Sequence, residues 1–247
     1  MSGVVRLDIR TKVLLVLAAT FVTCLVVGDI LGGKLVQGAV FGHVFTLTVG
    51  MIPFPVTFLL TDLLNEFYGR RAARTVTLIA FVMAVLTYAF IYVAAALPFA
   101  PFTFGADWKG VNEASFANVF LGSQRMIIAS LTAFLVAQFV DIAIFHALKQ
   151  RTSGKMLWLR ATGSTVVSQL VDTAVINVIA WAGLMSFDQM VNVMISSYIA
   201  KVGIALALTP ALYGGHAVVE RSLGLRPVVI GADGEAIEAP IEAPAST

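Results

Sequence analysis

Charged residues are scarce in this chain of 247 residues, and their scarcity excludes a water-soluble domain. Asp, Glu, Lys and Arg make up 12% of the residues, hydrophobic residues make up 59%, and the mean hydropathy is +0.92. A soluble domain carries about 25% charged residues, because its surface must be hydrated. The composition therefore indicates an integral membrane protein.

Cysteine and the common catalytic motifs are also lacking. Cys24 is the single cysteine, which excludes an intramolecular disulfide and a cysteine-based metal cluster. The sequence contains no HExxH, GxSxG or GxGxxG motif and no P-loop. We therefore expect no enzyme, no catalytic residue, no cofactor and no resident metal. The net charge of +2 gives no indication of a nucleic-acid partner.

Long apolar stretches are what the sequence does contain. A helix needs about 20 mostly apolar residues to cross a bilayer. Six stretches qualify, at 12–31, 40–61, 75–97, 126–147, 164–185 and 190–213. They predict an all-α integral membrane protein with one six-helix transmembrane domain over residues 1–226. Residues 227–247 are rich in Pro, Ala and Glu, which predicts a disordered cytoplasmic tail.

The positions of the basic residues predict the orientation. Twelve of the sixteen Lys and Arg residues lie before the first stretch, in the second and fourth loops, or after the sixth stretch. Short loops rich in Lys and Arg stay in the cytoplasm. We therefore expect both termini in the cytoplasm and the protein in the cell inner membrane. The third loop, 98–124, is outside and aromatic, with a short interfacial helix expected from Asn112 to Phe120; it acts either as an interfacial anchor or as a lid.

Three charged residues stand out inside the predicted spans: Asp141, Asp172 and Lys201. A charge in the hydrocarbon layer costs at least about 2.5 kcal/mol, so such residues face a cavity or a partner. At 1.5 Å per residue, the three lie at depths that let them meet in one layer, with the lysine facing both carboxylates. They form either part of a substrate site or a buried ion pair that fixes the helix register.

Polar residues surround these charges at helical spacing. Ser168 and Asp172 are four residues apart, Gln169 and Asn177 continue the same face, and Gln138 lies three residues before Asp141. This density favours a substrate cavity over simple contact between helices. The pattern small-Gln-apolar-Val-Asp-x-Ala-apolar also occurs twice, at 137–144 and 168–175, either by chance or as an inverted repeat of the kind found in transporters.

The end of the second stretch carries two acidic residues, Asp62 and Glu66, one helical turn apart. One interpretation is a salt-bridge cluster at the inner surface with Arg70, Arg71 and Arg74. Paired acids at this spacing are also compatible with a divalent metal, which would fit a membrane-embedded, metal-dependent enzyme that acts on lipid.

Four segments, in order along the chain, resemble the queuosine precursor transporter family, also called the putative vitamin uptake transporter family. They are TDLLNEFYGRRAAR at 61–74 with Phe54 before it, RMIIASLTAFLVAQFVDIAIF at 125–145, STVVSQLVDT at 164–173, and Lys201 through Pro210 to Gly214. The resemblance implies six helices, similar to the substrate-binding subunits of energy-coupling-factor transporters. It also implies import of 7-cyano-7-deazaguanine, or its 7-aminomethyl relative, for the queuosine of transfer RNA.

The polar residues suit such a base, because one carboxylate accepts from both N1–H and N2–H of a guanine edge. We expect Asp172 to read this edge with Gln169 or Asn177 assisting, while Lys201 either donates to O6 or holds Asp141 ionised. An aromatic ring of Phe54, Trp181 or Tyr198 would stack on the base. The full predicted substrate site is Asp172, Gln169, Asn177, Asp141, Lys201, Gln138, Ser168, Phe54, Trp181 and Tyr198. The alternative is a vitamin or purine uptake subunit that needs a separate ATPase module, which nothing in the sequence indicates.

Overall fold

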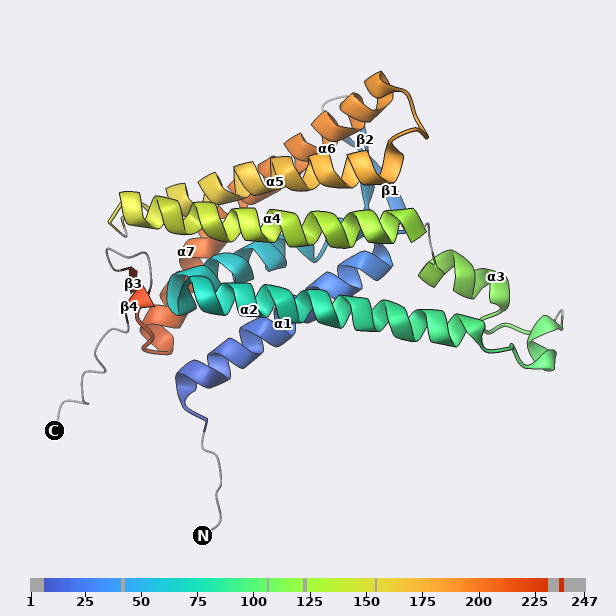
Figure 1. The fold of residues 1–247 in the computed structure, drawn as a ribbon, viewed down its shortest axis with the longest axis horizontal. Coiled ribbons are helices and arrows are strands. Elements are labelled where there is room, and N and C mark those ends of the chain that lie inside the picture. The colour runs from blue at the N-terminus through green and yellow to red at the C-terminus, as the bar shows by residue number, and fades with distance from the viewer. Residues whose placement is uncertain are drawn as a thin grey trace, which may run out of the picture.

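The structure is a computed structural model, and it describes residues 7–40, 43–105, 107–121, 124–153, 155–230 and 236–237. The described chain is mostly helical (Figure 1). Five helical segments are long and apolar enough to cross a membrane: Ile9–Leu31, Val49–Ala96, Glu113–Arg151, Leu157–Trp181 and Phe187–Ala207. The prediction of a helical, multi-pass membrane protein is therefore confirmed, and the six-span count stays a prediction.

The second predicted span, 40–61, is wrong as a single helix. After α1 (Ile9–Leu31) the chain forms an antiparallel hairpin of β1 (Leu35–Val40) and β2 (His43–Thr48), followed by the short turn η1 (Val49–Met51). Helix α2 (Phe54–Ala96) begins only after this turn. Val, Thr and Phe in this segment favour strands, and short apolar runs do not distinguish strand from helix by periodicity.

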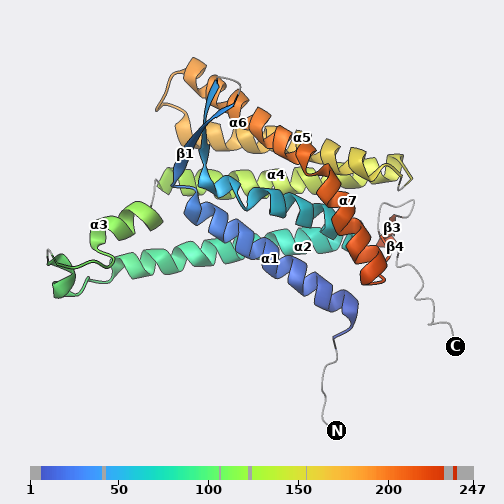
Figure 2. The same cartoon turned by 180° about the vertical axis from the view of Figure 1, so that it is seen from behind.

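Helix α2 contains a sharp bend at Gly69. The backbone there has φ 77° and ψ 178°, a conformation that is essentially restricted to glycine. Figures 1 and 2 show that the two arms of α2, residues 54–68 and 70–96, run in opposite directions from this bend. At 1.5 Å per residue the first arm is about 22 Å long. One long helical segment therefore supplies two antiparallel arms.

The second half of the chain is built on an antiparallel helix pair, α4 (Gln124–Arg151) and α5 (Leu157–Trp181), which make the most extensive contact between helices. Helix α6 (Phe187–Ala207) packs on α5, and α7 (Thr209–Ala217) continues after it. The predicted span 190–213 is therefore divided at Leu208, because Pro210 lies in the first turn of a new helix. The chain continues through η4 (Val218–Ser222) to the short hairpin of β3 (Val229–Ile230) and β4 (Ala236–Ile237).

The aromatic third loop contains the expected short helix. After η2 (Pro101–Phe104), helix α3 (Glu113–Phe116) and the turn η3 (Ala117–Leu121) follow one another. The Asn112 side chain accepts a hydrogen bond from the Ser115 backbone N–H, and the Ser115 hydroxyl side chain reaches back to the Asn112 backbone. This reciprocal cap explains why the helix begins at this position.

Packing is concentrated between α1, α2 and α4, where the hydrophobic core includes Leu17, Phe21, Leu64, Phe67 and Ile142. Helix α6, by contrast, buries none of its side chains, and many large hydrophobic residues point outward from the bundle. Outward-facing apolar side chains at this density fit a lipid environment, where they cost nothing.

The four basic segments of the chain lie at one end of the bundle, which we call the basic end. Figure 1 shows at its left-hand side the start of α1, the bend of α2, the turn between α4 and α5, and the end of α7. Near the start of α1, Asp8 caps the helix by accepting a hydrogen bond from the Thr11 N–H at 3.2 Å, and hydrogen bonding with Thr11 lowers the pKa of this carboxyl. The charge pattern in the sequence thus correctly groups these segments on one side.

Candidate functional site

Two groups of polar side chains, most of them buried, include residues of α5. The first, which we call the central polar layer, lies in the middle of the bundle. Its members are Gln138, Asp141, Ser168, Gln169, Asp172, Thr173, Asn177 and Lys201. The second, the Glu66 cluster, lies at the basic end and consists of Glu66, Lys149, Arg160 and His216.

An ion pair between Asp172 on α5 and Lys201 on α6 is the first element of the central polar layer. The two side chains are 14% and 13% exposed. The Lys201 ammonium also lies 5.1 Å from the centroid of the Phe54 ring, a cation–π contact that joins α2 to the pair. The structure therefore brings together three of the predicted site residues from three separate helical segments.

Asp141 does not share this lysine, so the expectation that Lys201 faces both carboxylates is wrong. The Ser168 hydroxyl donates to Asp141 Oδ1 at 3.1 Å, and Ser164 also interacts with this carboxylate. Asp141 is 6% exposed, and its partners are hydroxyl groups rather than a cation. The two aspartates that the sequence pattern repeats have acquired different partners.

Four buried polar atoms of the central polar layer have no hydrogen-bond partner among the described residues. They are Gln138 Oε1, Gln169 Oε1, Thr173 Oγ1 and Asn177 Oδ1. Three of them lie on one face of α5, four residues apart. An unsatisfied buried polar group costs about 1–3 kcal/mol, so this layer holds unused hydrogen-bonding capacity. The Asn177 amide donates to the Thr173 carbonyl at 2.8 Å, which leaves its oxygen as the free acceptor.

The remaining predicted aromatic residues occupy separate positions. The Tyr198 hydroxyl donates to the Val166 carbonyl at 3.1 Å, which holds α6 against α5. Trp181 is the last residue of α5 and lies one turn beyond Asn177, half-buried. Phe54 packs edge-on against Phe58, with ring centroids 4.3 Å apart. Among these rings, the Phe54 contact with Lys201 is the one that the structure places at the ion pair.

Asp29 of α1 is a site residue that the sequence interpretation missed. The Ser130 hydroxyl donates to Asp29 Oδ1 at 2.9 Å, Oδ2 has no hydrogen-bond partner in the described part of the chain, and the carboxylate interacts electrostatically with Asp172. The signal was present, because an acidic residue inside the first apolar stretch is as unusual as one inside the fourth or fifth.

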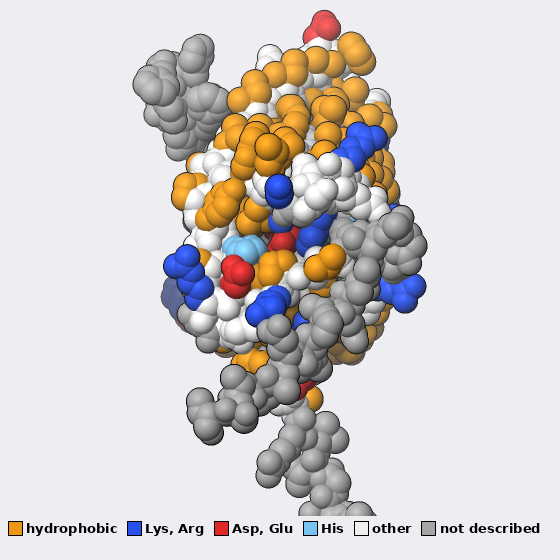
Figure 3. All heavy atoms as spheres, turned by 90° about the vertical axis from the view of Figure 1, so that its left-hand side faces the viewer, with side chains coloured by type: hydrophobic (Ala, Val, Ile, Leu, Met, Phe, Trp, Pro, Cys, Tyr) orange, Lys and Arg blue, Asp and Glu red, His pale blue; other side chains and the backbone are white. Residues whose placement is uncertain are grey.

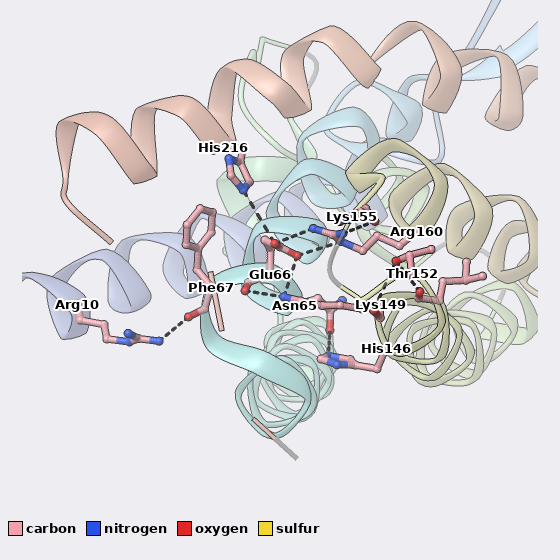
Figure 4. A network of polar contacts seen from close by, with 11 residues as sticks. Arg10, Asn65, Glu66, Phe67, His146, Lys149, Thr152, Lys155, Arg160 and His216 are labelled. Carbon is pink, nitrogen blue, oxygen red and sulfur yellow. Dashed lines mark hydrogen bonds and ion pairs between the residues drawn. The ribbon is translucent and has the colours of Figure 1, made fainter. Parts of the chain in front are cut away.

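The Glu66 cluster is densely paired, and all of its members except His216 are buried (Figure 4). Arg160 donates to both carboxylate oxygens of Glu66, at 2.7 and 3.1 Å, and Lys149 Nζ lies 2.9 Å from Oε2. Glu66 and Arg160 are each 2% exposed, and the His216 ring lies 3.9 Å from Oε1. The paired arrangement meets the condition under which a charge is tolerated in a low-dielectric interior.

The bend at Gly69 explains why basic groups gather at this point. A helix that ends leaves its last carbonyls without partners, and its C-terminus carries partial negative charge. The Glu66 carbonyl accepts from Lys149 Nζ at 3.1 Å and from the Val228 N–H at 2.9 Å, and the Phe67 carbonyl accepts from Arg10 at 2.6 Å. The end of the first arm of α2 is thus capped from α1, from α4 and from the segment after α7.

The expected salt-bridge cluster at Glu66 exists, but the sequence interpretation assigned it the wrong cations. Arg70, Arg71 and Arg74 were expected, whereas Lys149 and Arg160 make the contacts. The hydropathy pattern places these two residues in the fourth loop, whereas α4 and α5 extend far enough to bury them. Asn65 is likewise buried, and its side-chain oxygen lies 3.2 Å from His146 Nε2.

A hollow of about 1030 Å³ opens beside the Glu66 cluster at the basic end. Figure 3 looks toward this end and shows acidic and histidine side chains near its centre, basic side chains around them, and hydrophobic side chains mainly above. The lining includes Glu66, Lys149, Arg160, Tyr213 and His216, with Val228 at its edge. Among the residues that the structure describes, no group of three or more His, Cys, Asp or Glu side chains is placed to hold a metal ion.

The chain is similar to known membrane transporters. Residues 48–215 match the model of a family described as putative vitamin uptake transporter. The probable queuosine precursor transporter of Bacillus subtilis (strain 168) is 30% identical over 70% of this chain and 73% of its own length. The queuosine precursor transporter of Escherichia coli (strain K12) is 29% identical over 69% and 72%, respectively. The probable queuosine precursor transporter of Haemophilus influenzae is 28% identical over 72% and 71%. No solved structure matches the chain.

Proposed function

This chain belongs to the putative vitamin uptake transporter family, and on that premise we propose that it imports a queuosine precursor into the cytoplasm. The relatives are named as queuosine precursor transporters, and the family consists of transporters rather than enzymes. The precursor is 7-cyano-7-deazaguanine, its 7-aminomethyl relative, or both. The basic end faces the cytoplasm, with both termini on that side and six passes through the inner membrane, because α2 contributes two antiparallel arms.

The observation that carries the substrate assignment is the unused hydrogen-bonding capacity beside Asp172. A 7-deazaguanine presents several N–H donors, at N1, N2 and the pyrrole ring, next to the O6 acceptor. The free atoms on α5 and α4 are oxygens, at Gln169, Asn177 and Gln138, and they are therefore complementary to a donor-rich ligand. Binding would satisfy groups that are unpaired in the empty protein.

We assign the individual roles from the contacts of the ion pair. Asp172 accepts from N1–H and N2–H, and the Lys201 ammonium, which now pairs with Asp172, donates to O6 of the bound base. Phe54 already lies against Lys201 and stacks on the flat base, a contact worth about 1–3 kcal/mol. The remaining members of the central polar layer and the rings of Trp181 and Tyr198 complete the walls.

The test is import of 7-cyano-7-deazaguanine by cells that can neither synthesise nor import it, with queuosine in their transfer RNA as the readout. We expect the wild-type protein to restore queuosine and Asp172→Ala to fail at equal membrane abundance. Asp107→Ala is the matched control, because Asp107 is exposed and lies far from the layer in sequence and structure. It should restore queuosine fully.

Each alternative outcome has a definite meaning. Restoration by Asp172→Ala as well as by the wild type would keep the transport function and reject the assigned role of Asp172. Failure of the wild type would favour a vitamin or another purine as substrate, or dependence on a separate energising module. The same cells supplied with a vitamin or purine, with and without a co-expressed ATPase module, distinguish these cases.

A further inference from the structure

Asp62 is a buried carboxylate that the proposed substrate site does not use. It lies on the first arm of α2, is 6% exposed, and makes no hydrogen bond or ion pair with the residues that the structure describes. The charged groups that interact with it are Asp141 of α4, Glu66 on its own helix, and Arg160 of α5. Its surroundings on α6 and α7 are apolar or hydroxyl side chains, namely Ala205, Leu208, Thr209 and Leu212.

The acidic residues lie at successive positions along one face of α5, and we call each of these positions a step. Arg160, Ser164, Ser168 and Asp172 follow one another at intervals of four residues, which is about 6 Å per step. Glu66 lies at the Arg160 step, Asp141 lies between the two serines, and Asp172 is itself the last step. Asp62 lines a small space together with Thr162 and Thr165, which flank Ser164 on α5, so the middle step carries two carboxylates.

The middle step differs from its neighbours in its charge balance. Glu66 has Arg160 and Lys149 against it, and Asp172 has Lys201. Asp141 has serine hydroxyls, and the one cation that acts on Asp62 is Arg160, which is already bound to both oxygens of Glu66. Two carboxylates buried in one region without a cation of their own cannot both be charged without a large cost, so one of them holds a proton.

A small, partly open cavity lies beside Asp62. Asp62 lines this space of about 20 Å³, which has enough room for one water molecule. Glu66, one turn further along α2, lines the large hollow at the basic end. A buried, unpartnered carboxyl group therefore faces a water-sized space one helical turn from the open hollow.

We propose that the Asp62–Asp141 pair carries the proton that couples substrate import to the proton gradient. The proposal rests on the import function proposed above and adds its energy source. In each cycle the pair takes up one proton when the outer path is open and releases it into the hollow at the basic end when the inner path opens. One proton moves inward with each substrate, and no other co-reactant is required.

The test uses the full-length protein in liposomes with labelled 7-cyano-7-deazaguanine. With the interior more alkaline by one unit and no membrane potential, one-to-one coupling predicts accumulation of about tenfold. Asp62→Asn should lose this accumulation while keeping exchange of labelled for unlabelled substrate within about twofold, because exchange needs no net proton movement. Asp141→Asn should also lose the accumulation. Asp62→Glu should restore accumulation, and the exposed control Asp107→Asn should behave as the wild type.

The outcomes separate the two proposals. A wild-type protein that neither binds nor exchanges the substrate contradicts the import function. A wild-type protein that exchanges but does not accumulate, or that accumulates with a sodium gradient alone, overturns proton coupling and leaves import intact. Normal accumulation by Asp62→Asn, or loss of exchange together with accumulation, also rejects the coupling role. If the Asn variants do not fold, substrate-driven alkalinisation of the external medium by the wild type decides: one proton per substrate is expected, and none refutes the proposal.

Discussion

The Glu66 cluster and the central polar layer both include residues of α5, yet they differ in how completely their polar groups are paired. Around Glu66, the carboxylate and the backbone carbonyl behind it both have partners within hydrogen-bonding distance. In the central polar layer, amide and hydroxyl oxygens of Gln169, Thr173 and Asn177 have none in the described chain.

The difference indicates what each region is for. A fully paired network stabilises one arrangement of helices, and any change to it is costly. An incompletely paired network lowers the stability of the empty protein, and this loss is recovered when a ligand supplies the missing partners. The comparison makes specific predictions, because the same type of substitution should affect folding in one region and binding in the other.

Removing Arg160 should have the largest effect, and the effect should be on folding. Arg160→Ala leaves Glu66 buried with Lys149 as its remaining contacting cation, and we expect a loss of about 3 kcal/mol of stability. The measurement is thermal unfolding in detergent, with Arg151→Ala, an exposed cation on the rim of the same hollow, as the control. A variant as stable as the control would show that the Glu66 cluster is not structural.

Removing the charge of Asp172 should affect binding more than folding. In Asp172→Asn the ammonium of Lys201 retains partial exposure and the Phe54 ring, so stability should change less than in Arg160→Ala. Loss of a charge-assisted hydrogen bond to the substrate should weaken affinity by about 2 kcal/mol, roughly 30-fold. Equilibrium binding of 7-cyano-7-deazaguanine to purified protein measures this, and unchanged affinity would contradict the assigned role.

Two hydroxyl groups on α5 provide the sharpest comparison. Thr173 Oγ1 has no partner, whereas the Ser168 hydroxyl donates to Asp141. Thr173→Val should therefore raise the stability of the empty protein by about 1 kcal/mol and weaken substrate binding about fivefold, while Ser168→Ala should lower stability. Unfolding and binding are measured on both variants. If both variants lose stability equally, the unpaired Thr173 hydroxyl does not destabilise the empty protein, and the prediction is wrong.

The smallest effect is expected at Phe54. Phe54→Leu keeps an apolar side chain but removes the ring that faces Lys201, so affinity should fall about fivefold, which corresponds to about 1 kcal/mol of stacking. Phe90→Leu is the control, because Phe90 is exposed on the outer face of the bundle. Competition between guanine and the 7-deazaguanine in a binding assay reports the change, and equal affinities for the two variants would remove Phe54 from the site.

The sequence predicts the residues that are exceptional in an apolar context and misses the partners that depend on helix length. Asp172 and Lys201 were expected to pair, because a charge inside a span has few partners available. The contact of Glu66 with Lys149 and Arg160 was missed, because both basic residues were counted as loop residues, whereas α4 extends to Arg151 and α5 begins at Leu157.

The elements of the fold likewise divide into those that the sequence predicts and those that it misses. Hydropathy correctly locates α1, α4 and α5, which are each long and apolar enough to cross a membrane. It fails at residues 40–61, where six residues of strand and a turn precede a helix that starts behind a proline. The reversal at Gly69 depends on a backbone conformation at one residue, and no periodicity in the flanking sequence reports it.

The hydrogen bond from the Val228 N–H to the Glu66 carbonyl makes the segment around residue 228 a suitable place for a probe of helix motion. Because this hydrogen bond joins the segment after α7 to the end of the first arm of α2, a motion that separates these two segments breaks it. Cys24 is the one native thiol, so a fluorophore can be addressed to a new cysteine at position 229 once Cys24 is replaced. Residue 229 is exposed, which leaves room for such a probe to follow single transport cycles optically.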